Sequence, residues 1–420
     1  MENFHNSQSG RQRAHSRNDA DSKLLRVLIV APSFDILGGQ AVQAARLLDR
    51  LRQEPGLEVG FLPVNPRLPG VLRKLQAIKY VRTVVTSIAY LASLLNRVRH
   101  YDVVHIFSAS YFSFLLAPTP AILVGTLYGK KLLLNYHSGE AEDHLHRWRR
   151  SAIPTIRLAD ELIVPSSYLV RIFAKVGLPA KPIYNLIETD CFRFRERLSL
   201  RPVFLSNRNF EKHYGVARVL RAFATIQKRI PDARLIVAGD GPERRSLERL
   251  ARDLNLQNVE FTGRVGHERV VELYDSADIF LNGSQIDNQP LSLLEAFACG
   301  LPVVTTDAGG IPDMVVPGKT ALVVPRGEYE QLAASALHLL DDSALAHSII
   351  QHARKECRKY QWGAVRNQWL NVYYELAGGS GARQMSPEYE RVVSKTGETV
   401  DSGDAKQPHA ELEENQRAAL

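Results

Sequence analysis

The sequence predicts an α/β protein with two successive doubly wound domains and a ligand-binding cleft between them. Short apolar runs typical of buried parallel strands alternate with amphipathic helical periodicity, and this alternation starts near residue 24 and again after about residue 201. A chain of 420 residues is long enough for two such domains. In this fold class ligands bind at the carboxyl ends of the strands, so residues that directly follow a predicted strand are the first candidates for a site.

The first domain opens with a strand, a glycine-containing loop and a helix. The apolar run 24–31 predicts a buried strand that stops at Pro32, and residues 42–51 have the spacing of an amphipathic helix. Gly38 and Gly39 lie between them, where missing side chains either let a ligand approach the backbone or simply permit a tight turn. Further strands are expected at residues 57–63, 102–107, 131–137 and 160–167, the last running into a helix cap.

The second domain repeats this order after a junction near residues 192–201. Strands are expected at residues 202–206, 233–239, 259–262, 279–282, 302–306 and 321–324, with helices at 216–230 and 243–254 among them. A last helix is expected near residues 362–374. We therefore divide the chain into a disordered tail (1–23), a first domain (24–195), a second domain (196–360), a final helix (361–377) and a second disordered tail (378–420).

The composition indicates a globular protein of a reducing compartment. Hydrophobic residues make up 45% of the chain, and its three cysteines are far apart in no metal-ligand spacing, which favours the cytoplasm over a disulfide framework. The polar start of the chain lacks the apolar segment of a signal peptide. Residues 103–129 hold no charged side chain, but Pro118 and Pro120 favour a strand, a turn and a helix over a membrane span.

The net charge of +8 is compatible with nucleic acid, an anionic membrane or a phosphate-bearing substrate. No acidic residue occurs between Glu58 and Asp102, and residues 71–99 combine helical apolar spacing with a basic face. This segment either docks on anionic lipid or covers the sheet with its charges in water. Nucleic acid is disfavoured because no recognition motif accompanies the charge.

The run of residues 287–300 carries two carboxylates eight residues apart, Asp287 and Glu295. Pro290 suits the first turn of a helix, because proline lacks the N–H that is unsatisfied there. The cap would then lie near Asn288 or Gln289. The amides of Leu291 and Ser292 would be free to bind phosphate oxygens, Glu295 would face ribose hydroxyls, and Asp287 would reach hydroxyls beyond the phosphates.

Basic and glycine residues after other strands of this domain point to the same ligand. Arg208 follows the strand 202–206, where a guanidinium would clamp a diphosphate, and Lys212 lies four residues further on. Gly239 and Gly263 follow two more strands, and the backbone up to Val265 would face a nucleobase. Solvated loop charges and ordinary turns are the alternative explanation for each of these residues.

Taken in order, residues 205–215, 237–242, 261–265, 287–300 and 301–312 resemble glycosyltransferase family 4. The resemblance extends over roughly residues 25–375. It implies the GT-B fold, with two Rossmann-like domains, of which the first takes the acceptor and the second the nucleotide sugar, and a final helix that crosses back onto the first. It also implies retaining transfer of a hexosyl unit to a hydroxyl acceptor in bacterial-type polysaccharide or glycolipid assembly, on the inner face of the membrane and without metal or cofactor.

The resemblance also assigns roles to single residues. Arg208, Asp287 and His137 would be catalytic, with His137, at the end of the strand 131–137, favoured over His105 as the histidine that faces the donor sugar. The nucleotide-diphosphate sugar would contact the following residues: Gly38, Gly39, Lys212, Gly239, Gly263, Val265, Asn288, Pro290, Leu291, Ser292 and Glu295.

Two positions depart from the family pattern. Asp287 stands where the family usually has glutamate, and Tyr214-Gly215 stands where it usually has a Lys-Gly pair, which puts the role of Lys212 in doubt. Two other functions therefore stay open: an epimerase that acts on a nucleotide sugar with the same fold, and a non-catalytic protein that binds the nucleotide sugar in an assembly.

Overall fold

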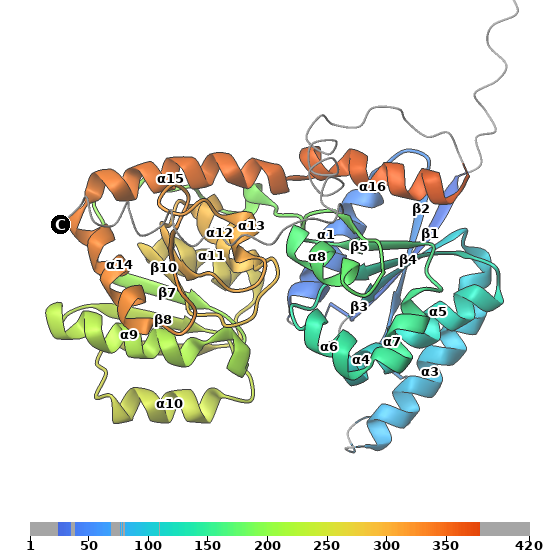
Figure 1. Cartoon of the computed structure of the whole chain (residues 1–420), viewed down its shortest axis with the longest axis horizontal. Helices are drawn as coiled ribbons and strands as arrows, with labels where there is room; N and C mark the ends of the chain where they lie inside the picture. The colour runs from blue at the N-terminus through green and yellow to red at the C-terminus, as the bar shows by residue number, and fades with distance from the viewer. Residues whose placement is uncertain are drawn as a thin grey trace, which may run out of the picture. The chain divides into compact units, whose positions relative to one another are not determined.

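The computed structural model describes residues 24–34, 38–68, 76, 78, 80–108 and 110–378. The predicted disordered tails, apart from Gly378, and most of residues 69–79 lie outside these ranges. Within them the chain forms two parallel sheets of six strands each, one in each half of the sequence (Figure 1). The α/β fold class predicted from the sequence is therefore confirmed.

The first sheet has the strand order β2-β1-β3-β4-β5-β6, and every pairing is parallel. Its strands are β1 (Leu25–Ala31), β2 (Leu57–Pro63), β3 (Val103–Ser108), β4 (Lys131–Tyr136), β5 (Glu161–Val164) and β6 (Lys181–Pro182). The strand order reverses between β1 and β3, so a ligand crevice is expected at the carboxyl end of β1. The loop with Gly38 and Gly39 lies there.

Helices cover both faces of this sheet. One face packs against α1 (Gly39–Leu51) and α16 (Trp362–Leu376), whose Trp369 and Tyr373 share a core with Val27 and Ile29 of β1. The other face is covered by the following helices: α3 (Val81–Arg97), α4 (Tyr111–Leu116), α5 (Pro118–Leu127), α6 (Ala141–Arg147), α7 (Arg149–Ile156) and α8 (Ser167–Ala174). Because both faces are covered, the strands are nearly continuous apolar runs, which is why they could be read from the sequence.

The second sheet has the order β12-β11-β10-β7-β8-β9, again with every pairing parallel. Its strands are β7 (Val203–Asn207), β8 (Arg234–Ala238), β9 (Val259–Gly263), β10 (Ile279–Asn282), β11 (Val303–Thr306) and β12 (Leu322–Val324). Its order reverses between β7 and β10. Arg208 follows β7 and Asp287 follows β10, so the two residues flank the crevice expected at this reversal.

The second sheet is also covered on both faces. One face carries α9 (Val216–Arg229), α10 (Arg244–Asp253) and α14 (Tyr329–Asp341). The other carries α11 (His267–Ser276), α12 (Leu291–Cys299), α13 (Ile311–Met314) and α15 (Ser343–Cys357). The described residues between 103 and 129 form β3 and then two helices, α4 and α5, where a strand, a turn and one helix were expected. Among the described residues no helix combines the length and apolarity of a membrane span.

The chain passes between the two halves twice, and the two passages are hydrogen-bonded to each other. The first follows β6 and the second joins α15 to α16. The Ile187 amide donates to the Tyr360 carbonyl at 2.8 Å, and the Gln361 side chain donates to the Thr189 hydroxyl at 2.7 Å. Tyr360 is 1% exposed. The two passages therefore form one packed seam.

A cluster of three arginines around the buried Asp278 fastens the first passage to the second domain. Asp278, fully buried, accepts from Arg195, Arg197 and Arg201. Arg197 also donates to the carbonyls of Cys299 at 2.6 Å and Gly300 at 2.9 Å, at the end of α12. Burial alone would raise the pKa of Asp278, but hydrogen bonds from Arg201 and the nearby guanidiniums outweigh it, so the pKa lies below its ordinary value.

We predict that Asp278→Asn lowers the free energy of unfolding by about 3 kcal/mol, because it leaves the Arg197 guanidinium charged and buried without its counter-ion. Urea unfolding followed by circular dichroism measures the change. Asp341→Asn is the matched control, since its pair with Arg229 at 2.9 Å is exposed and contributes little. Equal losses in the two variants would contradict this account of the cluster.

Candidate functional site

A pocket of about 780 Å³ lies between the loops that follow the strands of both sheets. Its first-domain wall consists of the start of α1, the loop after β4 and Asn185. Its second-domain wall consists of the loops after β7, β8 and β9 and of residues 286–292 with Glu295. The loops at the two points where the strand order reverses therefore line one pocket.

Most of the residues that the sequence predicted for the donor line this pocket. They are Gly38, Gly39, His137, Arg208, Gly239, Val265, Asp287, Asn288, Pro290, Leu291, Ser292 and Glu295. Other wall residues were not singled out from the sequence: Gln40, Arg46, Glu140, Glu211 and Arg264. Gln40, Arg46 and Glu140 lie in no motif. Glu211 and Arg264 lie within the runs 205–215 and 261–265 that resemble the family, but the resemblance assigned them no role.

Lys212 and Gly263 were expected at the donor, but neither is on the pocket wall. Lys212 begins the short helix η3 (Lys212–Tyr214) and is exposed, whereas Tyr214 of the same turn lines the pocket. Gly263 is buried at the end of β9, with φ +72, and its carbonyl accepts from the Gly239 amide at 3.0 Å. A turn exposes its residues in different directions, which spacing along the sequence does not resolve.

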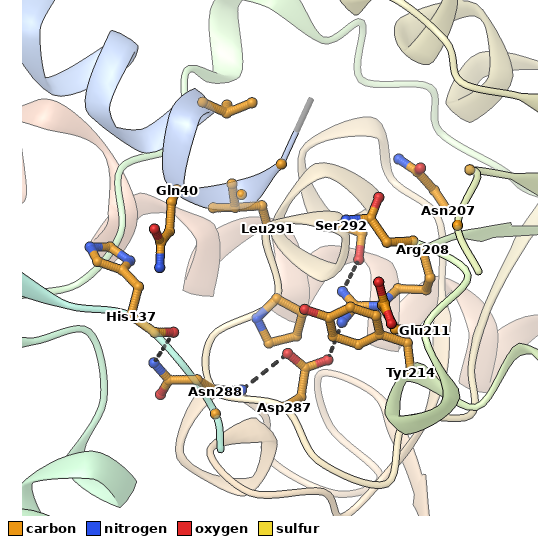
Figure 2. Close-up of a pocket in the computed structure, with 18 of the residues that line it drawn as sticks. Gln40, His137, Asn207, Arg208, Glu211, Tyr214, Asp287, Asn288, Leu291 and Ser292 are labelled. Atoms are coloured by element: carbon orange, nitrogen blue, oxygen red, sulfur yellow. Dashed lines mark hydrogen bonds and ion pairs between the residues drawn. The ribbon is translucent and has the colours of Figure 1, made fainter. Parts of the chain in front are cut away.

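Arg208 and Asp287 form a buried ion pair at the second-domain wall. Figure 2 shows their side chains meeting beside Ser292, whose hydroxyl accepts from Arg208 at 3.1 Å. The guanidinium also lies over the Tyr214 ring, 4.1 Å from its centroid, which is a cation–π contact. Arg208, which was predicted to bind the phosphates, is thus paired with Asp287, which was predicted to bind the sugar.

The backbone at Asp287 is packed between glycines of both domains. A Cβ on Gly309, where φ is +55, would lie 2.0 Å from the Asp287 carbonyl oxygen. From the first domain, a Cβ on Gly139 would lie 3.1 Å from the Asp287 carbonyl carbon. The Asp287 carboxylate also accepts from the Ser284 hydroxyl and the Asn288 amide, each at 3.0 Å. These backbone contacts and hydrogen bonds together hold Asp287 in place.

Helix α12 begins one residue later than its sequence suggested. Pro290, expected in the first turn, is the cap residue with an extended ψ of 117°, and its carbonyl accepts from the Leu293 amide at 3.2 Å. The φ of −67° that proline requires suits the cap as well as the first turn, so the residue type alone could not separate them. Leu291 and Ser292 are now the first two helical residues, and their amides have no acceptor within the helix.

The two candidate histidines occupy different environments. His137 lines the pocket, stacks on Phe107 with ring centroids 5.0 Å apart, and has a buried Nε2 without a hydrogen-bond partner among the described residues. His105 lies in the core, with Nδ1 2.8 Å from the Tyr373 hydroxyl and Nε2 3.1 Å from the Asn135 amide nitrogen. Burial lowers the pKa of each to about 3, so both rings are neutral at pH 7.

No three His, Cys, Asp or Glu side chains in the described part of the chain are grouped so that they would hold a metal ion. Arg46, Arg208 and Arg264 supply the guanidiniums of the pocket wall. The wall also carries the carboxylates of Glu140, Glu211, Asp240, Asp287 and Glu295. Guanidiniums and a helix N-terminus suit an anionic ligand, and carboxylates accept hydrogen bonds from hydroxyl groups of such a ligand.

Two family models match consecutive parts of the chain. Glycosyltransferase Family 4 matches residues 37–190, and Glycosyl transferases group 1 matches residues 191–356. The chain belongs to glycosyltransferase family 4, and its two domains have the GT-B architecture, as the sequence predicted.

Similar proteins agree with this assignment. Sulfoquinovosyl transferase SQD2 of Arabidopsis thaliana is 26% identical over 71% of this chain, and the match spans 62% of its own length. The GDP-mannose-dependent alpha-(1-6)-phosphatidylinositol monomannoside mannosyltransferase of Mycobacterium tuberculosis is 30% identical over 56% of this chain and 68% of its own. The crystal structure of Anabaena HepE with UDP and glucose has a TM-score of 0.67 at 17% identity, covering 84% of this chain and all of HepE.

The low pKa of His105 makes stability fall in acid. Below about pH 6.5 this histidine is protonated in the unfolded chain but stays neutral in the folded protein. The free energy of unfolding therefore falls by about 1.4 kcal/mol per pH unit for each such histidine as the pH falls towards 3. We predict that His105→Gln flattens this slope, measured by urea unfolding between about pH 6 and pH 5. His338→Gln, at an exposed position on α14, should keep the slope of the parent protein. Parallel slopes for His105→Gln and its parent would refute the explanation.

Proposed function

We propose that this chain transfers a hexosyl unit from a nucleotide-diphosphate sugar to a hydroxyl acceptor, with retention of anomeric configuration. The observation that carries the proposal is the second-domain wall, where Arg208, Asp287 and the N-terminus of α12 meet in one pocket. Glu295 lies one turn along the same helix. Phosphate, sugar and ribose thus each have a matching group along one short run of chain.

The diphosphate would bind Arg208 and the first amides of α12. A guanidinium supplies two parallel donors for phosphate oxygens, and the amides add the positive end of the helix dipole. Because Arg208 pairs with Asp287, a phosphate that binds Arg208 would have to draw the guanidinium away from this carboxylate. That exchange would release Asp287 to accept hydrogen bonds from the sugar.

His137 would face the sugar from the first domain. Figure 2 shows its ring on the opposite side of the pocket from Arg208, with Asn288 donating to the His137 carbonyl at 3.4 Å. Its unpartnered Nε2 is the group that a sugar hydroxyl would satisfy. Since the ring is neutral, it would bind without adding charge next to the reacting carbon.

The reaction we propose breaks the bond between the anomeric carbon and the diphosphate oxygen before the new glycosidic bond is complete. Arg208 and the α12 amides would stabilise the negative charge that develops on the departing diphosphate, which is electrostatic catalysis. The acceptor hydroxyl would attack from the face that the diphosphate leaves and pass its proton to a phosphate oxygen. The positive charge would come from protein groups, so this scheme uses no metal.

The names of similar proteins support a nucleotide-sugar donor and an assembly role. The mycobacterial relative is named for GDP-mannose and a phosphatidylinositol monomannoside, and HepE was solved with UDP and glucose. We propose a lipid-linked or glycan acceptor in polysaccharide or glycolipid assembly, with the protein on the inner face of the membrane. Tyr214 and Asp287 are the positions where this chain departs from the family pattern, so donor choice would depend on them.

Arg208→Ala should lower kcat/KM by about 10²- to 10³-fold, because one donor that stabilises developing charge is lost. Product formation from UDP- and GDP-sugars, detected by mass spectrometry with and without EDTA, measures the effect. Lys212→Ala, four residues away but exposed, should turn over normally. Near-normal turnover of Arg208→Ala would overturn the assignment, and loss of activity in EDTA would overturn the metal-free scheme.

The same assay separates the other two functions. An epimerase would convert the donor into a different nucleotide sugar with no acceptor present. A non-catalytic assembly protein would bind the donor but leave it intact with every acceptor tried. Either result contradicts the transferase proposal.

A membrane-facing surface on the first domain would bring the enzyme to a lipid-linked acceptor. Helix α3 exposes Val84, Ile88, Leu91 and Leu95, and α5 exposes Leu123 and Leu127, which are 52% and 71% exposed. Arg82, in the first turn of α3, and Arg99, in the 3-10 turn η1 (Val98–His100) that follows α3, are also exposed. No acidic residue accompanies them in residues 59–101. An apolar face bordered by cations fits an anionic lipid surface.

We expect Ile88→Glu combined with Leu127→Glu to reduce binding to phosphatidylglycerol vesicles by at least about tenfold, through lost apolar burial and added negative charge. Vesicle co-sedimentation measures it, with phosphatidylcholine vesicles for comparison. Leu198→Glu is the control, because Leu198 is 72% exposed but lies far along the chain, before β7. Undiminished binding of the double variant would rule out this surface.

A further inference from the structure

We infer that Arg46, on α1 of the first domain, is a positioning residue for Glu295, the carboxylate proposed to bind ribose. The inference rests on the proposed function, because Glu295 takes its role from it. Arg46 was not singled out from the sequence, yet it lines the pocket and is 6% exposed. Its Nη2 lies 3.5 Å from Glu295 Oε1, so an ion pair joins the two domains at the pocket wall.

The Arg46 guanidinium is itself held in place from the first domain. Its Nη1 donates to the Leu186 carbonyl at 3.2 Å. Gln43, one turn earlier on α1, holds the same residue from both sides: its amide donates to the Leu186 carbonyl, and its oxygen accepts from the Leu186 amide, each at 2.7 Å. A side chain with this support presents its remaining N–H groups in one direction.

The other oxygen of Glu295 is fixed from the second domain. The Tyr274 hydroxyl lies 3.1 Å from Glu295 Oε2 and 3.0 Å from the Ser292 carbonyl oxygen, so these two acceptors share its one proton. Burial raises the pKa of Tyr274 well above its ordinary value, so the hydroxyl keeps its proton and stays a donor. One oxygen is thus oriented by Tyr274 and the other by Arg46, which leaves the outward lone pairs of the carboxylate for hydroxyl groups of a ligand.

The rest of the run that includes Glu295 is also gripped by the first domain. The Ser166 hydroxyl donates to the Asn288 side chain, and the Asn185 amide donates to Gln289 Oε1 at 2.7 Å. Gly139 lies against the Asp287 backbone. Both ends of the run 287–295 are therefore held across the cleft. Ribose recognition would be complete only with the domains together, so nucleotide binding would favour that arrangement.

Arg46→Met tests the inference, because methionine keeps an apolar stem and removes the charge. The measurement is calorimetric binding of UDP and GDP, each compared with its 2′-deoxy and 3′-deoxy forms. In the parent protein, loss of a hydroxyl that binds a carboxylate should cost about tenfold or more in affinity. In Arg46→Met we expect this discrimination to shrink to about threefold or less. Arg46→Lys should be intermediate, because lysine keeps the charge but lacks the rigid guanidinium fork that spans Leu186 and Glu295.

Arg50→Met is the matched control. Arg50 lies one turn further along α1 and pairs with Glu188 at 3.3 Å, away from the pocket wall. It should keep the full discrimination. A purely structural role of Arg46 would weaken all nucleotides alike, and that uniform loss overturns the inference, as does full discrimination in Arg46→Met.

Glu295→Gln distinguishes failure of the positioning role of Arg46 from failure of the proposed ribose site. If it abolishes the discrimination while Arg46→Met preserves it, the positioning role fails and the proposed ribose site stands. If Glu295→Gln itself preserves the discrimination, the ribose site fails and the inference about Arg46 fails with it. Loss of discrimination in both variants is the result we expect.

Discussion

The pocket depends on the contacts that the first domain makes with residues 287–295. This run supplies Asp287, the N-terminus of α12 and Glu295. Asp287 packs against Gly139, Asn288 is hydrogen-bonded to Ser166, and Glu295 is paired with Arg46. Glycine at positions 139, 309 and 310 is what permits so close a packing, since a Cβ on Gly310 would lie 2.2 Å from the Asn288 carbonyl oxygen. The chemistry proposed for the site therefore belongs to neither domain alone.

The fold was predictable from the sequence because parallel strands covered on both faces are unbroken apolar runs. The same logic located Arg208 and His137, since residues after a strand must lie at the ligand edge of the sheet. The role of Arg46 could not be predicted from the sequence, because a charged residue on a helix face has no special pattern. Its importance comes from a partner some 250 positions away in the chain, and no local rule encodes that pairing.

Local geometry limited the remaining assignments. Lys212 and Tyr214 are two residues apart, yet only Tyr214 reaches the pocket wall, because the turn between them is a single 3-10 helical turn. Pro290 was expected in the first turn of α12, as its residue type allows, but it is the N-cap residue of this helix. Asp287 was identified as a carboxylate of the site, but its pairing with Arg208 was not foreseen, since each had been assigned to a different part of the ligand.

The seam formed by the two chain passages has a mechanical consequence. Two separate tethers would leave the domains free to twist, slide and bend relative to each other. Here the tethers are bonded side by side at Ile187–Tyr360 and Thr189–Gln361, and the Asp278 cluster anchors one of them rigidly. A rotation about that seam would leave these bonds in place, whereas twisting or sliding of the domains would break them. Restriction to one axis would let Arg46 and Glu295 meet again in the same geometry if the cleft opened and closed.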